Sequence, residues 1–154
     1  KHVAVKNKQV VNIKTYMTGE FFKLLSEKSI LSASVDKTTD LNSEKNKKAF
    51  EAGVKESLHS NLLNSSFTVR TNYLFHKLTQ QENYHYLSGL LIGTEIGDTA
   101  GSDCVMTLVS DPHLHSKYDE AFNLVTNKTG SLQMQNADKA IVAGQLEILK
   151  RLLR

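Results

Sequence analysis

Two short turns hold the residues with the clearest chemical potential. Ser110-Asp111-Pro112 joins an apolar run to a segment of helical spacing. Asp111 can cap that helix, and Pro112 fits its first position because the missing N–H is no loss there. Open α/β sheets bind ligands at the carboxyl ends of their strands, and helix starts favour anions or polar groups. The turn therefore either borders a ligand or simply begins a helix.

The second turn is Met17–Glu20, between a β-branched run and another helical pattern. Gly19 permits close approach of the backbone, and Thr18 can cap the helix. Glu20 could accept hydrogen bonds from a polyol ligand. It could equally be a first-turn carboxylate that stabilises the positive end of the helix dipole. The residues themselves leave both interpretations open.

Other familiar chemistries are missing from the sequence. His113 and His115 lie two apart, so they do not share a helix face as an i, i+4 metal pair does. No GxxxxGK[ST] phosphate loop or GxSxG motif is present. The single cysteine, Cys104, leads an apolar run and is expected to be a buried thiol. We expect no metal site and no self-contained active site.

The composition is that of an ordinary globular domain. The chain has 154 residues, 40% hydrophobic and 23% charged, with a net charge of +3. That charge is too small to indicate nucleic-acid binding, and no run approaches the roughly 20 apolar residues of a membrane span. A chain without disulfides fits a reducing cytoplasm. We therefore expect neither nucleic acid nor membrane as a partner.

The periodicity predicts an α/β fold with more helix than strand. Residues 2–6 and 9–17 form a hairpin around Asn7 and Lys8, and the last two strand–helix units form parallel neighbours. A hairpin cannot shield a sheet alone, so we expect a mixed sheet flanked by helices whose first strand lies upstream of Lys1. The predicted strands are 104–110 and 131–135, a loop covers 32–42, and the predicted helices are 18–31, 43–58, 62–78, 80–97, 112–125 and 136–154.

Small residues recur at helical spacing in two places. Gly89, Gly93 and Gly97 fall every four residues, and each glycine costs up to about 1 kcal/mol relative to alanine within a helix. Three in register therefore indicate close packing of one helix backbone against another. Ala140 and Gly144 form a similar stripe in the last helix.

Four segments in order resemble the C-terminal half of the bacterial 2-keto-3-deoxy-galactonokinase family. They are "TYMTGEFFKLLSEKSIL", "FEAGVKESL" with "TVRTNYLFHKL", "YLSGLLIGTEI", and "VMTLVSDPHLHSKYDEAF" with "DKAIVAGQLEIL". The resemblance covers nearly the whole chain, and "MTGE" before a helix and "YLSGLLIG.E" are its most specific parts. It implies a ribonuclease-H-like domain of the sugar kinase/heat-shock/actin ATPase superfamily, in which two domains close around a cleft.

The resemblance also implies a reaction and its ligands. The family transfers the γ-phosphoryl group of ATP, with Mg²⁺, to the 6-hydroxyl of 2-keto-3-deoxy-galactonate during galactonate breakdown. This chain would be the nucleotide-side domain, and its partner would be the missing N-terminal domain. The first phosphate loop and the general base would lie in that missing half, so no catalytic residue is expected here and the chain alone is expected to be inactive.

Individual positions follow from the same resemblance. Lys1 would end the family's Gly-Thr-His-x-Lys phosphate loop, and Thr18, Gly19 and Glu20 would lie near the sugar or the phosphates. Ser110, Asp111 and Pro112 would lie beside the adenosine. A glycine is common at position 110 in the family, so Ser110 changes how closely the backbone can approach the nucleotide, although its hydroxyl could donate a hydrogen bond instead.

The small-residue helices would then pack at the junction of the two domains. This role is implied for Ala140, Ala143 and Gly144, and for Gly89 and Gly93. Two other classes of function stay open: a stand-alone interaction module, and a nucleotide-binding regulator of the same superfamily without catalysis.

Overall fold

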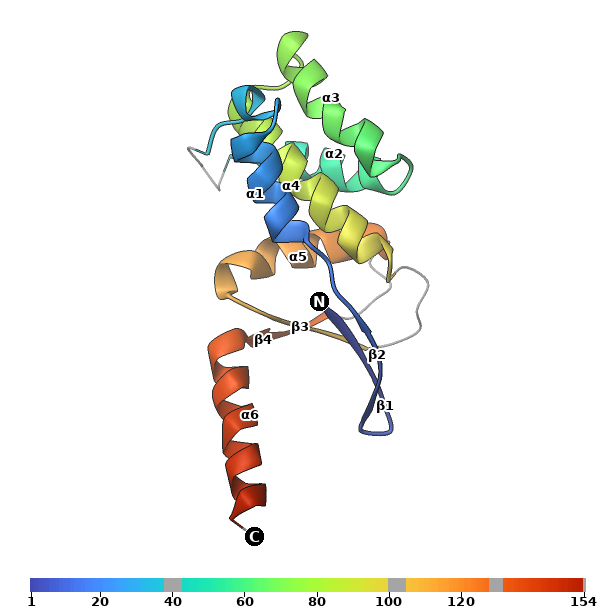
Figure 1. Cartoon of the computed structure of the whole chain (residues 1–154). Coiled ribbons are helices and arrows are strands. Elements are labelled where there is room, and N and C mark those ends of the chain that lie inside the picture. The colour runs from blue at the N-terminus through green and yellow to red at the C-terminus, as the bar shows by residue number, and fades with distance from the viewer. Residues whose placement is uncertain (38–42, 100–104, 128–131, 154) are drawn as a thin grey trace.

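The computed structural model describes residues 1–37, 43–99, 105–127 and 132–153. Figure 1 shows helices α1 to α4 gathered above α5, with two small sheets below and α6 projecting away from them. The elements in chain order are β1 (His2–Lys6), β2 (Gln9–Lys14), α1 (Thr18–Lys28), the 3₁₀ helix η1 (Ser32–Ser34), α2 (Glu44–Ser57), α3 (Leu62–Leu74), α4 (Gln80–Gly97), β3 (Met106–Ser110), α5 (Pro112–Val125), β4 (Leu132–Asn136) and α6 (Ala137–Leu152).

The predicted N-terminal hairpin is present. β1 and β2 pair antiparallel, and Asn7 and Lys8 turn the chain with φ values of 52° and 63°. Both turn residues therefore adopt the left-handed conformation that a two-residue hairpin requires. Every side chain of β2, and all of β1 except His2, is exposed. Neither face of the hairpin is covered by the described residues.

The second pair of strands is parallel, as predicted. β3 and β4 are aligned so that Ser110 lies opposite Asn136. The prediction of one mixed sheet is not met by the described residues, because the strands form two separate two-stranded sheets. β1 has β2 as its hydrogen-bonded neighbour and β3 has β4, and no described strand joins the two pairs.

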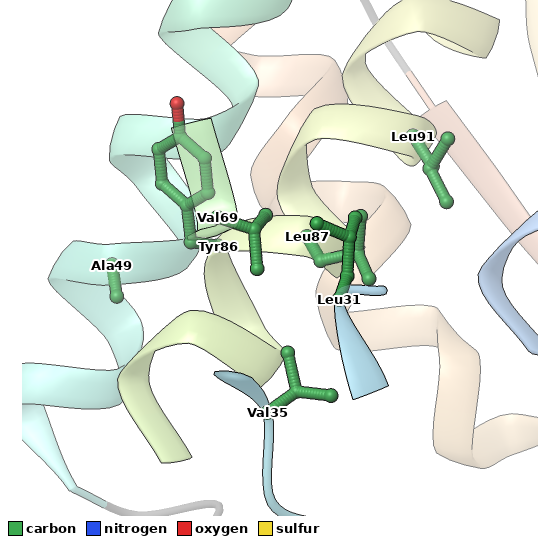
Figure 2. Close-up of a cluster of buried hydrophobic side chains, with 7 residues drawn as sticks. All are labelled: Leu31, Val35, Ala49, Val69, Tyr86, Leu87 and Leu91. Carbon is green, nitrogen blue, oxygen red and sulfur yellow. The ribbon is translucent and has the colours of Figure 1, made fainter. Parts of the chain in front are cut away.

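The core lies among the helices rather than against the strands. α4 is the central helix and carries twelve buried residues. One cluster joins it to α2, α3 and the residues on either side of η1, and Figure 2 shows its members: Leu31, Val35, Ala49, Val69, Tyr86, Leu87 and Leu91. A second cluster joins α2, α4 and α5 through Phe50, Val54, Ile92, Ile96, Ala121 and Phe122.

Two of the three glycines in the α4 stripe, Gly89 and Gly93, make the close backbone contact that the spacing predicts, whereas a Cβ on Gly97 would meet only the Leu58 side chain at 3.6 Å. The partner helix is α2, which approaches so closely that a Cβ on Gly89 would lie 2.9 Å from the carbonyl carbon of Phe50. A Cβ on Gly93 would lie 3.0 Å from Val54 Cα. Gly53 on α2 permits the same close approach, since a Cβ there would lie 2.8 Å from Leu90 N. Three glycines therefore bring the two helices together.

Several helix ends follow their sequence signals. Thr79 and Glu82 form a reciprocal capping box at the start of α4, and Asp111 accepts a hydrogen bond from the His113 amide at the start of α5. Asn136 caps α6 in the same way. These caps satisfy backbone donors that a helix leaves unpaired at its start.

Other local predictions need correction. Thr18 does not cap α1, because Met17 occupies the cap position and Thr18 lies within the helix. η1 interrupts the predicted loop at 32–42, α1 ends at Lys28, and α3 ends at Leu74. Cys104 lies outside the described residues.

α6 is the most exposed helix. No residue of α6 is buried, and a Cβ on Gly144 would meet no atom within 4 Å. Its described neighbours are β3 and β4 at its start (Figure 1). In the parts of the chain that are described, no helix combines the length and apolar character needed to cross a membrane.

Candidate functional site

A small hollow lies where β2 leads into α1 beside the last turns of α4. Its volume is about 280 Å³, slightly below the range usual for drug-sized ligands. Most of its wall is apolar, and none of the described residues that line it is a lysine, arginine or histidine. The lining residues are Thr15, Tyr16, Met17, Thr18, Phe21, Leu62, Leu91, Thr94 and Glu95.

Glu95 is the buried polar group of this hollow. Its side chain is only 7% exposed, yet it lies on α4 among apolar neighbours. Its Oε2 accepts a hydrogen bond of 2.5 Å from the Thr18 hydroxyl and one of 2.9 Å from the Tyr118 hydroxyl. Its Oε1 lies 3.3 Å from His2 Nε2. Glu95 therefore links the hairpin, α1 and α5 to α4, and a buried carboxylate needs such partners.

A second carboxylate follows one helical turn later. Asp98, the cap residue after α4, accepts hydrogen bonds from Lys14 Nζ at 2.7 Å and from the Tyr16 hydroxyl. The Tyr16 ring packs against the His2 ring with centroids 4.4 Å apart. Residues 95 and 98 lie on one face of the helix. This face therefore holds the end of β2 against α4 with polar contacts.

The pKa shifts follow from this arrangement. Burial, together with the Glu95 carboxylate, raises the pKa of Tyr118, so its phenol stays protonated and can donate. Burial and the hydrogen bond to Asp98 raise the pKa of Tyr16 to about 12. Burial lowers the pKa of His2, and the Glu95 carboxylate opposes that shift in part.

The structure brings two of the predicted ligand residues to this carboxylate. Thr18 lines the hollow and bonds Glu95, and the backbone nitrogen of Lys1 lies 3.8 Å from Glu95 Oε1. Gly19 and Glu20 are exposed, and neither lines the hollow. A Cβ on Gly19 would meet no described atom within 4 Å.

Ser110, Asp111 and Pro112 lie at a different place, the carboxyl end of β3. Asp111 is exposed, and His113 Nδ1 lies 2.6 Å from its carboxylate, which already caps α5. This hydrogen bond lowers the pKa of Asp111. None of the three residues lines the hollow at Thr18. The described residues therefore do not bring the two predicted turns into one pocket.

The two small-residue stripes differ in how far they are buried. Gly89 and Gly93 contact α2 of this same chain, so their described packing is internal rather than at a domain junction. Ala140, Ala143 and Gly144 lie on α6, where Ala143 and Gly144 are exposed and Ala140 is partly covered. Among the described residues, no group of three or more metal-ligating side chains lies together.

Our interpretation of the sequence missed Glu95 and Tyr118. The available signal was a lone carboxylate between Leu91, Ile92 and Ile96, in a helix whose neighbouring residues are buried. Such a charge is seldom buried unless it is paired. Its partners could not be read from spacing because Thr18 is 77 residues away.

A solved structure is similar to this chain in its backbone fold over most of its length. It is described as the "crystal structure of a putative 2-dehydro-3-deoxygalactonokinase protein from Sinorhizobium meliloti". The TM-score is 0.78 at 30% sequence identity, over 92% of this chain and 46% of that chain. By fold, the chain therefore corresponds to about half of this protein.

The family is shown by sequence. A model of the 2-keto-3-deoxy-galactonokinase family matches residues 1–148, and this chain belongs to that family. It is 31% identical over 126 residues to the 2-dehydro-3-deoxygalactonokinase of Escherichia coli K12, covering 79% of this chain and 41% of the relative. It is 31% identical over 149 residues to the "Probable 2-dehydro-3-deoxygalactonokinase" of Rhizobium meliloti, covering 94% and 47%. The chain spans less than half the length of these relatives.

Proposed function

We propose that this chain is the C-terminal half of a 2-dehydro-3-deoxygalactonokinase. The whole protein would transfer the γ-phosphoryl group of ATP to the 6-hydroxyl of 2-keto-3-deoxy-galactonate. The observation that carries this proposal is the family match over residues 1–148, with coverage of 41% to 47% of the relatives' length. The family resemblance of the "MTGE" and "YLSGLLIG.E" segments supports it.

The reaction needs positioning more than covalent chemistry from the protein. The 6-hydroxyl oxygen attacks the γ-phosphorus, the bond from that phosphorus to the β,γ-bridging oxygen breaks, and ADP leaves. The hydroxyl proton passes to a general base, which we place in the half of the protein that precedes this chain. The residues proposed near the sugar or phosphates are Lys1, Thr18, Gly19 and Glu20.

We propose that the nucleotide lies at the other edge, beside Ser110, Asp111 and Pro112. The support is topological. β3 and β4 are parallel and end together at Ser110 and Asn136, and α5 and α6 both begin at that edge. Two helix starts at the carboxyl ends of parallel strands present backbone N–H groups to one space. Closure of the whole protein would bring this edge toward the acceptor sugar.

ATP-dependent phosphoryl transfer also implies Mg²⁺. The described residues contain no group of three metal-ligating side chains, so we assign none of them to the ion. Mg²⁺ in kinases is commonly bound by substrate phosphates and one or two carboxylates. No step proposed here passes through it.

The missing half would also complete the fold. A strand preceding β1 could pair with its free edge and with β3, which would join the two sheets into the single mixed sheet of a ribonuclease-H-like domain. The exposure of both faces of the hairpin and the separation of the two sheets support this proposal. We further propose that α6 packs at the domain junction through Ala140, Ala143 and Gly144. Six apolar residues are exposed along it: Ile141, Val142, Leu146, Ile148, Leu149 and Leu152.

The test compares the whole protein with residues 1–154 alone. Each is incubated with ATP, Mg²⁺ and 2-keto-3-deoxy-galactonate, and ADP release is followed. We expect turnover by the whole protein and none by the 1–154 chain. Turnover by the shorter chain would contradict the placement of the base upstream. ATP binding by the whole protein without turnover would instead indicate a non-catalytic regulator.

A further inference from the structure

The hydrogen bond between Thr18 and Glu95 restricts which ligand group Thr18 can meet. A threonine hydroxyl has one proton to donate and two lone pairs that accept. In the structure the proton is directed to Glu95 Oε2, at 2.5 Å. Toward the hollow, the Thr18 oxygen is therefore left as an acceptor.

The Thr18 proton is not easily released from this bond. Glu95 is 7% exposed, and its Oε2 is bonded by Thr18 and Tyr118. If Thr18 turned to donate elsewhere, a buried carboxylate would lose one of its hydrogen bonds, which carries the desolvation cost of a charged group. The phenol of Tyr118 lies on α5 and does not line the hollow, so it holds Glu95 from outside the hollow.

The charge in the hollow also favours a ligand group that donates a hydrogen bond. Among the described residues that line it, Glu95 is the one charged group, and most of the exposed wall is apolar. The Thr94 hydroxyl already donates to Leu90 O, and the Tyr16 hydroxyl to Asp98. An ionised phosphate has only acceptor oxygens and requires donors or cations around it. A sugar hydroxyl attached to carbon has a proton to donate and an apolar side to pack. The hollow fits the second group and repels the first.

We propose that Thr18 accepts a hydrogen bond from a hydroxyl of the sugar acid, and that Glu95 is the positioning residue that holds Thr18 in this orientation. The inference rests on the proposed function and decides one point that the family resemblance left open: Thr18 meets the sugar, not the phosphates. Glu95 acts through Thr18 and does not itself touch the reacting atoms.

The main test uses the whole protein with Thr18→Val, which keeps the shape and removes the hydroxyl. We expect KM for the sugar acid to rise about tenfold, the loss equivalent to one hydrogen bond, with KM for ATP changed less than about twofold. Thr18→Ser restores the hydroxyl and should restore KM for the sugar acid. KM does not depend on the concentration of folded enzyme, so partial unfolding does not mimic this split.

Two further variants test whether Glu95 orients Thr18 and whether a Thr→Val change elsewhere has the same effect. Glu95→Gln keeps the volume of the side chain and removes its charge, so it should raise KM for the sugar acid in the same direction as Thr18→Val. Thr71→Val makes the same side-chain change on α3, where the hydroxyl bonds Thr68 O in its own helix. This matched control should leave both KM values unchanged.

The outcomes distinguish this inference from the proposed function. If the wild-type protein turns over the sugar acid, and Thr18→Val raises KM for ATP alone or changes neither KM, the inference is overturned. The proposed function is unaffected by that result. A wild-type protein that does not turn over the sugar acid contradicts the function. Calorimetric binding of the sugar acid without ATP then tests Thr18 directly, and either absence of binding or equal binding by Thr18→Val overturns the inference.

Discussion

Gly89 and Phe50 are in contact through their backbones where α4 crosses α2. A Cβ added to Gly89 would lie 2.9 Å from the Phe50 carbonyl carbon and 3.2 Å from its Cα. Backbone cannot move aside as the end of a flexible side chain can. The separation of the two central helices is therefore set by the absence of a side chain at this position.

Gly89→Ala should destabilise the protein despite the better helix propensity of alanine. We expect a loss of about 2 kcal/mol from forced separation of α2 and α4, equivalent to a fall in Tm of about 4–8 °C. Thermal unfolding followed by circular dichroism measures it. Gly97→Ala is the matched control, because its nearest neighbour would be Leu58 Cδ2 at an ordinary 3.6 Å. Equal Tm values for the two variants would contradict this account of the stripe.

Gly144→Ala tests the proposed domain junction on α6. In the 1–154 chain an added Cβ meets no atom within 4 Å, so we expect up to about 1 kcal/mol of stabilisation from helix propensity. In the whole protein the same methyl group should destabilise, because the helix would there pack closely against the other half. Thermal unfolding of both forms measures the two effects.

The control for this comparison is Gln145→Ala, an exposed change on the same helix. Its effect on Tm should be the same in the 1–154 chain and in the whole protein. If the effect of Gly144→Ala on Tm is also the same in both, the small-residue stripe has no role at a junction.

His85 should make stability depend on acidic pH. Its side chain is buried on α4, and its Nε2 has no hydrogen-bond partner among the residues that the structure describes. Burial lowers the pKa of His85, and the positive charge of Lys117 on α5 lowers it further. The unfolded chain therefore binds a proton more readily than the folded one. The stability is fully present above the ordinary pKa of 6.5 and is lost as the pH falls through the folded pKa.

The measurement is urea unfolding at pH 7.5 and pH 5.5. The free energy of unfolding of the wild type should fall between these conditions, and His85→Phe should reduce that fall because phenylalanine takes up no proton. His59→Phe removes an exposed histidine and serves as the control. An unchanged pH dependence in His85→Phe would show that other groups cause the acid sensitivity.

Much of the local structure could be predicted because its causes are local. The left-handed residues Asn7 and Lys8 follow from hairpin geometry, and Thr79 and Asp111 cap their helices through atoms two or three residues away. The glycine spacing of α4 indicated a close helix contact without showing that α2 was the partner. Thr18 was misassigned as a cap for a related reason: its hydroxyl is bonded to a residue far along the chain.

The element order, most helix starts and the family could be read from the sequence, since these depend on neighbouring residues and on contiguous motifs. Only the tertiary structure placed Glu95 between Thr18, 77 residues before it, and Tyr118, 23 residues after it. It also decided that the described strands form two separate sheets. The burial of a carboxylate and the pairing of strand edges depend on contacts between segments that are distant in the sequence. The spacing of residues along the chain does not show which distant segments come into contact.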